Sequence, residues 1–406
     1  MTPYTKNGID PLLTILTVLV AFLGAGAVWD AAFAAGMMKG QGAFPMEFVK
    51  HCVGLLIGGI AYFVVSGIPI VKLKRITPWF YWIIFLACIL VLVPGLGQVA
   101  WGARRRLGGE ALGFQPAELL KPAMVVFLAL WACRKLPEFR RRGFVAWLDN
   151  VVPRIWPIII VGISFVLVEL EPDLGTALVI LMITFGMLLF GLGRNLYGKY
   201  NIRILSVFVC LAIAGISFLA LSKGYRVERI ENHAKRWQPG IVDGPGFQTT
   251  VAEKAMAVGG PVGVGVGKGM AKHVLPAATT DFICVTIFEE FGIIGSFTLI
   301  LLLSGITFRL LYLATFVKDS FGRLVLQGTG WWIGSQAIFN LLVAGSAIPT
   351  VGIPLPFFSY GNSSLLALGI ALGACRSAMS ARRTSEVARE NSGDGRGHGR
   401  SRLSGA

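Results

Sequence analysis

Charged residues are scarce in this chain: they make up 14% of its 406 residues, whereas hydrophobic residues make up 55%. An average soluble domain is about 25% charged, so this composition argues against a soluble protein. Uncharged runs recur, and each approaches the ~20 residues that a helix needs to cross a bilayer or reaches that length with its flanks. Examples are Pro11–Trp29, Cys52–Val71, Trp79–Gly102 and Leu174–Gly193. The sequence therefore predicts a polytopic, all-α membrane protein.

Several chemical signatures are also missing. Strand-like alternation of polar and apolar residues is absent, which argues against a membrane barrel. The six cysteines show no CxxC or Cys/His spacing, so free buried thiols are expected rather than disulfides or a zinc site. No Gly-Lys-Ser/Thr follows a glycine-rich loop at Walker spacing, which argues against an ATP site. Membrane topology explains most of the net charge of +16, and no nucleic-acid motif accompanies it, so no nucleic-acid partner is expected.

The uncharged runs predict ten membrane helices in a single domain over residues 1–383. An extracytoplasmic loop at about 222–280 interrupts them, and the Gly/Ser/Arg-rich tail 384–406 is expected to be disordered. The first run is too long for the apolar part of a signal peptide, so it is expected to remain as a helix. The expected helices are 10–30, 47–70, 78–97, 116–133, 153–170, 174–192, 203–221, 281–308, 324–345 and 363–380.

Basic residues favour a cytoplasmic position for both termini. Under that topology four basic segments fall on one side, as the positive-inside rule requires. Two loops on the opposite side, 98–115 and 223–280, are also rich in Lys and Arg. Cations held at the outer face indicate either contact with anionic lipid headgroups or binding of a pyrophosphate substrate. The four segments are Lys72–Arg75, Arg134–Arg142, Arg194–Arg203 and Lys318–Arg323.

One carboxylate, Asp281, stands where the long polar loop becomes an apolar helix. A glycine-rich, basic stretch, Gly259–Lys272, precedes it. Asp281 could cap the helix that follows, since Asp favours helix N-termini. It could also act as the general base for a sugar hydroxyl, which needs a positioned carboxylate near the acceptor. A carboxylate beside a cationic loop at a membrane surface suits chemistry on an anionic, lipid-linked substrate.

Other carboxylates recur near the membrane edge. Glu118 and Lys121 are three residues apart, so they share a helix face and are expected to form an ion pair or to shape a substrate cavity. Asp173 follows Pro172 and is expected to cap the next helix or to take part in that cavity. Glu289 and Glu290 lie within an apolar helix and are expected to find hydrogen-bond partners, with a proton path as an alternative.

Seven stretches, taken together and in order, resemble the SEDS family of FtsW, RodA and SpoVE proteins. They span nearly the whole chain. Val93–Gly97 and Gln336–Asn340 are more similar to the FtsW/SpoVE division branch than to the RodA branch. The seven stretches are Gly102–Arg105, Gln115–Lys121, Glu171–Thr176, Gly246–Gln248, Gly259–Gly267, Thr280–Ile283 and Pro349–Ser364.

The resemblance implies a glycosyltransferase that polymerises lipid II into glycan strands at the outer face of the bacterial cytoplasmic membrane. It also implies a class B penicillin-binding protein as partner, with other divisome or elongasome membrane proteins. No cofactor is certain, and a divalent cation, Mg²⁺ or Mn²⁺, is left open. Asp281 is the residue that the family uses for catalysis. The expected substrate-binding residues are Arg104, Arg105, Glu118, Lys121, Asp173, Arg226, Arg229, Gln248, Lys268 and Ser359.

The sequence departs from the family pattern at four positions. Arg106 stands where the family usually has Trp, and Asn362 where it has Gly. Ala277 and Thr279 replace a usual Glu and His. Two alternatives therefore stay open beside the polymerase: a flippase or transporter for a lipid-linked precursor, and a non-catalytic division scaffold.

Overall fold

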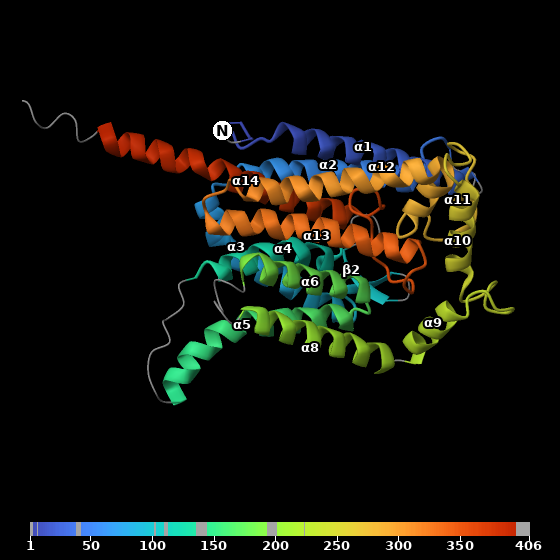
Figure 1. Cartoon of the computed structure of the whole chain (residues 1–406), viewed down its shortest axis with the longest axis horizontal. Helices are drawn as coiled ribbons and strands as arrows, with labels where there is room; N and C mark the ends of the chain where they lie inside the picture. Colours follow the sequence, from blue (N-terminus) through green and yellow to red (C-terminus); the bar gives the residue numbers. More distant parts are fainter. Residues whose placement is uncertain are drawn as a thin grey trace, which may run out of the picture.

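The computed structural model describes residues 3–5, 7–37, 42–100, 103–108, 113–134, 144–192, 201–222 and 224–394. The helices are α1 (Pro11–Met37), α2 (Met46–Ser66), α3 (Ile70–Leu92), α4 (Pro116–Ala132), α5 (Phe144–Leu170), α6 (Leu174–Met187), η1 (Leu188–Leu192), α8 (Asn201–Ser222), α9 (Gly224–Ala234), α10 (Phe247–Gly259), α11 (Ala271–Val274), α12 (Ile283–Ala314), α13 (Ser320–Ala344) and α14 (Asn362–Asp394). Two strands, β1 (Gly97–Ala100) and β2 (Ala103–Leu107), form a hairpin. The long helices run side by side, and α9 to α11 lie at the end of the bundle opposite the start of α1 (Figure 1).

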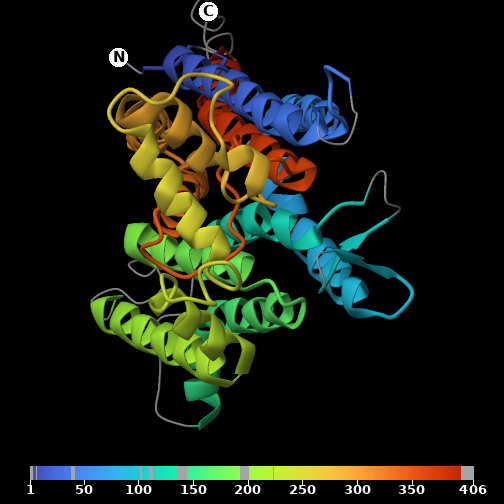
Figure 2. The same ribbon diagram turned by 90° about the vertical axis from the view of Figure 1, so that its right-hand side faces the viewer.

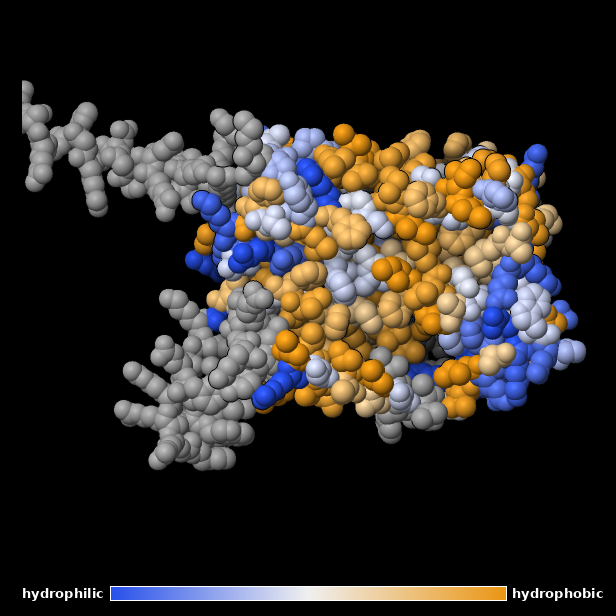
Figure 3. Space-filling model, viewed as in Figure 1, coloured by the Kyte–Doolittle hydropathy of each residue, from blue (hydrophilic) through white to orange (hydrophobic). Residues whose placement is uncertain are grey.

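The predicted all-α membrane fold is confirmed. Within the described residues a long helix occupies each of the ten expected positions, and six of these helices are long and apolar enough to cross a membrane. Large apolar side chains on their outer faces are exposed, for example Phe22 at 75% and Trp79 at 72%. Apolar residues dominate the middle of the surface in Figure 3, whereas hydrophilic residues gather at its ends. This pattern suits a lipid-facing surface between two aqueous faces.

Helix α4 lies at the centre of the bundle. This position explains why its sequence is apolar around most of its circumference. All of its residues except Leu130 are buried. It packs against α3, α6, α13 and α14, which enclose it (Figure 2). A helix that is apolar around its whole circumference is expected in such a position. Because α4 cannot shift without moving four neighbours, it is a rigid support for the polar residues at its N-terminus.

Helices α2 and α14 pack closely through glycines. Gly54 and Gly58 lie one turn apart on α2, and Gly369 and Gly373 lie one turn apart on α14. A Cβ atom at Gly58 would lie 2.7 Å from the carbonyl oxygen of Leu365, and one at Gly369 would lie 2.0 Å from that of Gly58. Small residues at four-residue spacing let two membrane helices approach backbone to backbone.

Several predicted boundaries are wrong. Helix α3 begins at Ile70 after Pro69, not at 78, because Pro78 is accommodated inside the helix. The basic segment Lys72–Arg75 is therefore helical, and Lys74 pairs with Asp319 across 2.6 Å. The loop 98–115 contains the unexpected β hairpin. Of the basic segments, residues 135–143 and 193–200 lie outside the described residues.

Two further differences concern helix ends and thiols. Helix α14 continues through residues 384–394, where a disordered tail was predicted, because Glu, Ala and Arg support helix there; residues 395–406 lie outside the described residues. All six cysteines are free, as predicted. Cys52 and Cys210 are exposed rather than buried, because they lie on outward faces of α2 and α8.

Candidate active site

A cavity of about 490 Å³ opens among the ends of α2, α4, α6, α12 and α14. The hairpin strand β2 and the segment 350–354 complete its wall. Six of the predicted site residues line it: Arg105, Glu118, Asp173, Arg229, Gln248 and Asp281. The residues come from distant parts of the sequence, and the fold brings them together. The lining also contains Lys50, Arg106, Gln115, Thr176, Thr280, Tyr360, Asn362, Ser363 and Ser364.

The carboxylate of Asp281 faces this cavity and is partly buried. Capping is not its role, because Phe282 holds the cap position of α12 and no side chain caps that helix. No described residue donates a hydrogen bond to the carboxylate, although Asn340 fixes the backbone by donating to the Asp281 carbonyl across 2.9 Å. Burial raises the pKa of Asp281 to about 7; neighbouring Asp173 raises it further, and Arg105 opposes both. The group is therefore held in place, unpaired and able to take up a proton near neutral pH.

Asp173 is the N-cap of α6, as predicted. Its carboxylate accepts hydrogen bonds from the Thr176 amide (3.1 Å) and hydroxyl (3.0 Å). The side-chain amide of Gln115 also donates to it across 2.6 Å. Neighbouring Glu171 is fully buried, and burial together with Asp173 raises its pKa to about 8. Asp173 therefore remains at the cavity wall as a fixed acceptor, whereas Glu171 lies behind it.

A β-bulge aims two consecutive arginines at the cavity. In the hairpin, Gln98 pairs with Arg106 and Val99 pairs with Arg104, so Arg105 is the extra residue. A regular strand would send consecutive side chains to opposite faces, but a bulge re-aims them. Arg105 and Arg106 both line the cavity, and Arg104 does not. Arg105 also donates from Nε to the Glu171 carbonyl across 3.2 Å and from its terminal nitrogen to the Pro172 carbonyl.

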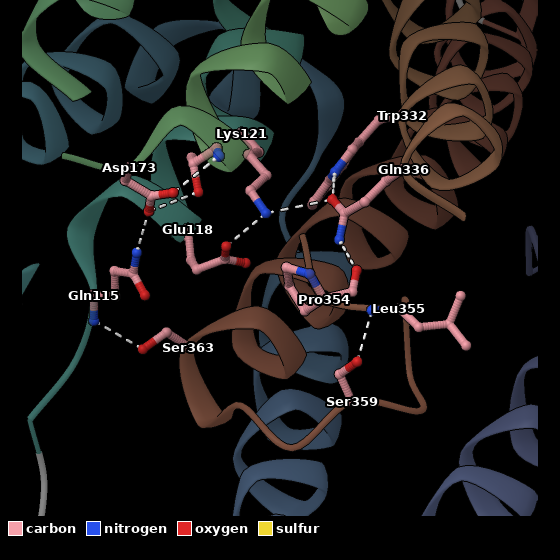
Figure 4. A network of polar contacts seen from close by, with 11 residues as sticks. Gln115, Glu118, Lys121, Asp173, Trp332, Gln336, Pro354, Leu355, Ser359 and Ser363 are labelled. Atoms are coloured by element: carbon pink, nitrogen blue, oxygen red, sulfur yellow. Dashed lines mark hydrogen bonds and ion pairs between the residues drawn. The ribbon is translucent and has the colours of Figure 1, made fainter. Parts of the chain in front are cut away.

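Glu118 reaches the cavity, and Lys121 stands behind it (Figure 4). The predicted ion pair is confirmed, with 2.6 Å between Lys121 Nζ and Glu118 Oε1. Lys121 is fully buried and also donates to Gln336 across 3.3 Å. Gln336 in turn donates to the Pro354 carbonyl across 2.7 Å. The network therefore ties α4, α13 and the segment 350–354 together behind the cavity wall.

Four other predicted site residues do not line the cavity. Arg226 is buried in a pair with Glu169, because α9 packs it against the end of α5. Ser359 is buried, donating to the Thr280 carbonyl (2.7 Å) and accepting from the Leu355 amide (2.6 Å), so it fixes the turn before Asp281. Lys268 is exposed on the glycine-rich turn, and Arg104 is exposed on β2. Arg229 and Gln248 do line the cavity, and Arg229 donates to the Thr350 carbonyl across 2.9 Å.

The glycine-rich stretch is held by the two carboxylates of α12. Glu289 accepts from the amides of Met270 and Ala271 at 2.9 and 2.8 Å, and Glu290 accepts from the Gly269 amide at 3.1 Å. Lys272 pairs with Glu290 and with Asp30 of α1, each at 2.6 Å. The prediction that Glu289 and Glu290 find hydrogen-bond partners is confirmed. These contacts fix the chain shortly before Asp281.

Sequence reasoning missed Lys50 as a lining residue. It lies in the first turns of α2, at the start of an apolar run that drew attention only as a membrane span. Its one signal was a lone cation at a membrane boundary. For a divalent cation, the described residues hold no group of three or more His, Cys, Asp or Glu side chains that could ligate one.

The chain is similar in sequence to known proteins over most of its length. The sequence model of the FtsW/RodA/SpoVE family, described as "Cell cycle protein", matches residues 10–384. The chain is 33% identical over 375 residues to stage V sporulation protein E of Bacillus subtilis, covering 91% of this chain and 96% of that protein. It is 32% identical to a probable peptidoglycan glycosyltransferase FtsW of Aromatoleum aromaticum, covering 90% and 86%.

Solved structures agree with these sequence relatives. One similar chain belongs to a peptidoglycan synthase complex that coordinates polymerization and crosslinking. It shares a TM-score of 0.68 and 26% identity, covering 90% of this chain and 96% of that one. A variant of the rod-shape-determining protein RodA of Thermus thermophilus gives a TM-score of 0.61 at 25% identity, with 90% and 96% covered.

Proposed function

Because the chain belongs to the FtsW/RodA/SpoVE family of cell cycle proteins, we propose that it is a peptidoglycan glycosyltransferase that polymerises lipid II. The observation that carries the proposal is Asp281: an unpaired carboxylate facing a cavity that also holds Arg105, Arg106 and Arg229. An unpaired base beside several cations suits transfer of a sugar from a diphosphate carrier. The departures at Ala277 and Thr279 leave the carboxylate itself in place.

In the proposed reaction Asp281 takes the proton from a sugar hydroxyl of the acceptor. The resulting oxygen attacks the anomeric carbon of the donor. The bond between that carbon and the diphosphate oxygen breaks, and the electron pair leaves with the lipid diphosphate, so the carbon is inverted. Arg105 and Arg229 are held by backbone carbonyls and stabilise the leaving diphosphate as its charge develops. Asp173 and Gln115 offer fixed hydrogen-bonding groups to the sugars.

The setting of this reaction is part of the proposal. The cavity would open at the outer face of the bacterial cytoplasmic membrane, with both termini in the cytoplasm. Since one similar chain works in a peptidoglycan synthase complex, a class B penicillin-binding protein is the proposed partner, alongside other divisome or elongasome proteins. The sequence relatives favour a role in division or sporulation.

The test is polymerisation of lipid II by the purified full chain with its penicillin-binding protein partner. Asp281→Asn preserves side-chain size but removes the base, so strand synthesis is expected to fall at least a thousandfold while expression and folding are unchanged. Asp243→Asn, an exposed carboxylate in the same extracytoplasmic loop, is the matched control and should retain activity.

The same assay separates the alternatives. Movement of lipid II across vesicles without strands would identify a flippase, and neither movement nor strands would identify a scaffold. Full polymerisation by a normally folded Asp281→Asn protein would overturn the assignment of Asp281.

A further inference from the structure

Gly352 lies in the cavity wall directly beside the carboxylate of Asp281. It is exposed, and both residues line the cavity. A Cβ atom at this glycine would lie 3.4 Å from Asp281 Oδ2. Apart from the neighbours of Gly352 in the chain, no other described heavy atom lies within 4 Å of that position. The space over Gly352 is therefore bounded on one side by a carboxylate oxygen and is otherwise open to the cavity.

The backbone of the segment 350–354 is fixed from several directions. Arg229, Asn340 and Gln336 donate side-chain hydrogen bonds to three of its carbonyls, across 2.9, 2.7 and 2.7 Å. The contact of Gln336 is visible in Figure 4. Gly175 of α6 packs on a fourth carbonyl, because a Cβ atom at Gly175 would overlap with that oxygen. The segment therefore cannot move aside to make room for a larger group in the cavity.

One side chain sets the distance between this segment and Asp281. The amide of Asn340 donates to the carbonyl of Asp281 across 2.9 Å and to that of Ile353, the residue after Gly352, across 2.7 Å. The oxygen of the same amide accepts from Cys284 Sγ across 3.3 Å, which fixes its orientation. Asn340 is fully buried. The gap between Gly352 and the carboxylate is therefore a fixed feature of the fold.

Neither backbone geometry nor crowding requires glycine at this position. The φ angle of Gly352 is not in the left-handed region that favours glycine. A methyl group here would meet Asp281 Oδ2 at an ordinary van der Waals distance. Glycine does, however, let a ligand approach the backbone closely. A hydroxyl that gives its proton to a base must lie about 2.6–3.2 Å from it, and a methyl group would take the room that the hydroxyl and its sugar ring need.

We propose that Gly352 is a specificity-determining residue that admits the acceptor sugar to Asp281. The acceptor hydroxyl enters the gap between the bare backbone at Gly352 and the carboxylate oxygen, and Asn340 keeps the width of that gap constant. The inference rests on the proposed function. Gly352 carries no charge to offer the donor's diphosphate, so a change at this position should act on the acceptor.

The first experiment separates acceptor from donor in the purified full chain with its partner. The donor is a lipid II epimer whose terminal sugar hydroxyl cannot attack, held at saturation, and unmodified lipid II is varied as acceptor. Gly352→Ala is expected to lower kcat/KM for the acceptor about a hundredfold, because the hydroxyl is displaced from the base. The apparent KM for the donor should stay within about twofold. Gly26→Ala, on an exposed face of α1 where a methyl group meets nothing within 4 Å, is the matched control and should match the parent.

The second experiment measures access to the carboxylate without any sugar transfer. Dicyclohexylcarbodiimide modifies buried carboxyl groups, and mass spectrometry of peptides gives the rate of modification at Asp281. Gly352→Ala should slow this rate about tenfold or more, and Gly352→Val further, because a larger side chain fills the gap. Gly361→Ala also adds a methyl group to the cavity lining, but 3.6 Å from Ser364 Cβ, so the rate at Asp281 should be unchanged. Thermal unfolding in detergent checks that each variant is folded.

The outcomes are distinct. Slower modification of Asp281, together with a lower acceptor kcat/KM and an unchanged donor KM, supports the role of Gly352. An unchanged rate of modification in both Gly352 variants, an equal slowing in Gly361→Ala, or an effect confined to the donor KM overturns it. If the parent protein makes no strands at all, the proposed function fails, whereas the modification rates still decide whether Gly352 controls access to the carboxylate.

Discussion

The ionisation of Asp281 links the reaction to pH. Burial raises the pKa of its carboxyl to about 7, well above the ordinary value of about 4. A general base works only when deprotonated, so kcat/KM is expected to rise with pH and to level off above about 7. Measurement of kcat/KM for lipid II between pH 5.5 and about 9 checks this. A flat profile below pH 7 would contradict the role.

The same shift predicts an effect on stability. Because the folded pKa exceeds the unfolded one, folding favours the protonated carboxyl, and stability is lost as pH rises from about 4 to about 7. Asp281→Asn removes this loss. The variant is therefore expected to have a higher Tm than the parent at pH 8 and an equal Tm near pH 4, as measured by thermal unfolding in detergent. A lower Tm at pH 8 would show that the carboxylate stabilises the fold.

At the scale of elements, α11 shows how a short helix is secured. Lys272 is 3% exposed and bridges Glu290 of α12 and Asp30 of α1. Lys272→Met would leave the buried carboxylate of Glu290 and the partly buried carboxylate of Asp30 without their cation, so a loss of about 3–5 kcal/mol in unfolding free energy is expected. Thermal unfolding in detergent measures it, with exposed Lys268→Met as the matched control.

A second variant tests the cause of that loss. Adding Glu290→Gln to Lys272→Met removes one stranded charge, so part of the lost stability should return. Strictly additive losses would mean that the ion pair itself is not responsible.

Elements differ in how far the sequence could predict them. Hydrophobic runs placed the ten long helices, and the position of Asp173 after Pro172 placed a cap that the structure confirms. The start of α3 was missed because Pro78 breaks the pattern without breaking the helix. The bulge at Arg105 could not be predicted, because it depends on which residues of β1 pair with β2. Lys50 was missed because its place in the cavity wall depends on how α2 packs against the distant start of α14.

At the scale of the whole molecule, the bundle has two different ends. The short helices α9 to α11 gather at one end, and the start of α1 lies at the other (Figure 1). If the first end is extracytoplasmic, Lys268→Cys should react with a membrane-impermeant maleimide in intact cells, because residue 268 is exposed. A cysteine at Lys318, in the connection between α12 and α13, should react only after the membrane is permeabilised. The opposite pattern would invert the proposed topology.

The glycine contacts between α2 and α14 have a consequence for how this protein can change over evolutionary time. At Gly58 and Gly369 the obstacle to a larger side chain is the backbone of the other helix, and a backbone cannot shrink to compensate. A substitution at either position therefore forces the two helices apart along their shared length. Lys50 on α2 and Asn362 at the start of α14 both line the cavity, so a mutation outside the lining would change the shape of the cavity. In a saturation library selected for growth, these glycines should tolerate fewer replacements than Arg104, which is exposed and does not line the cavity.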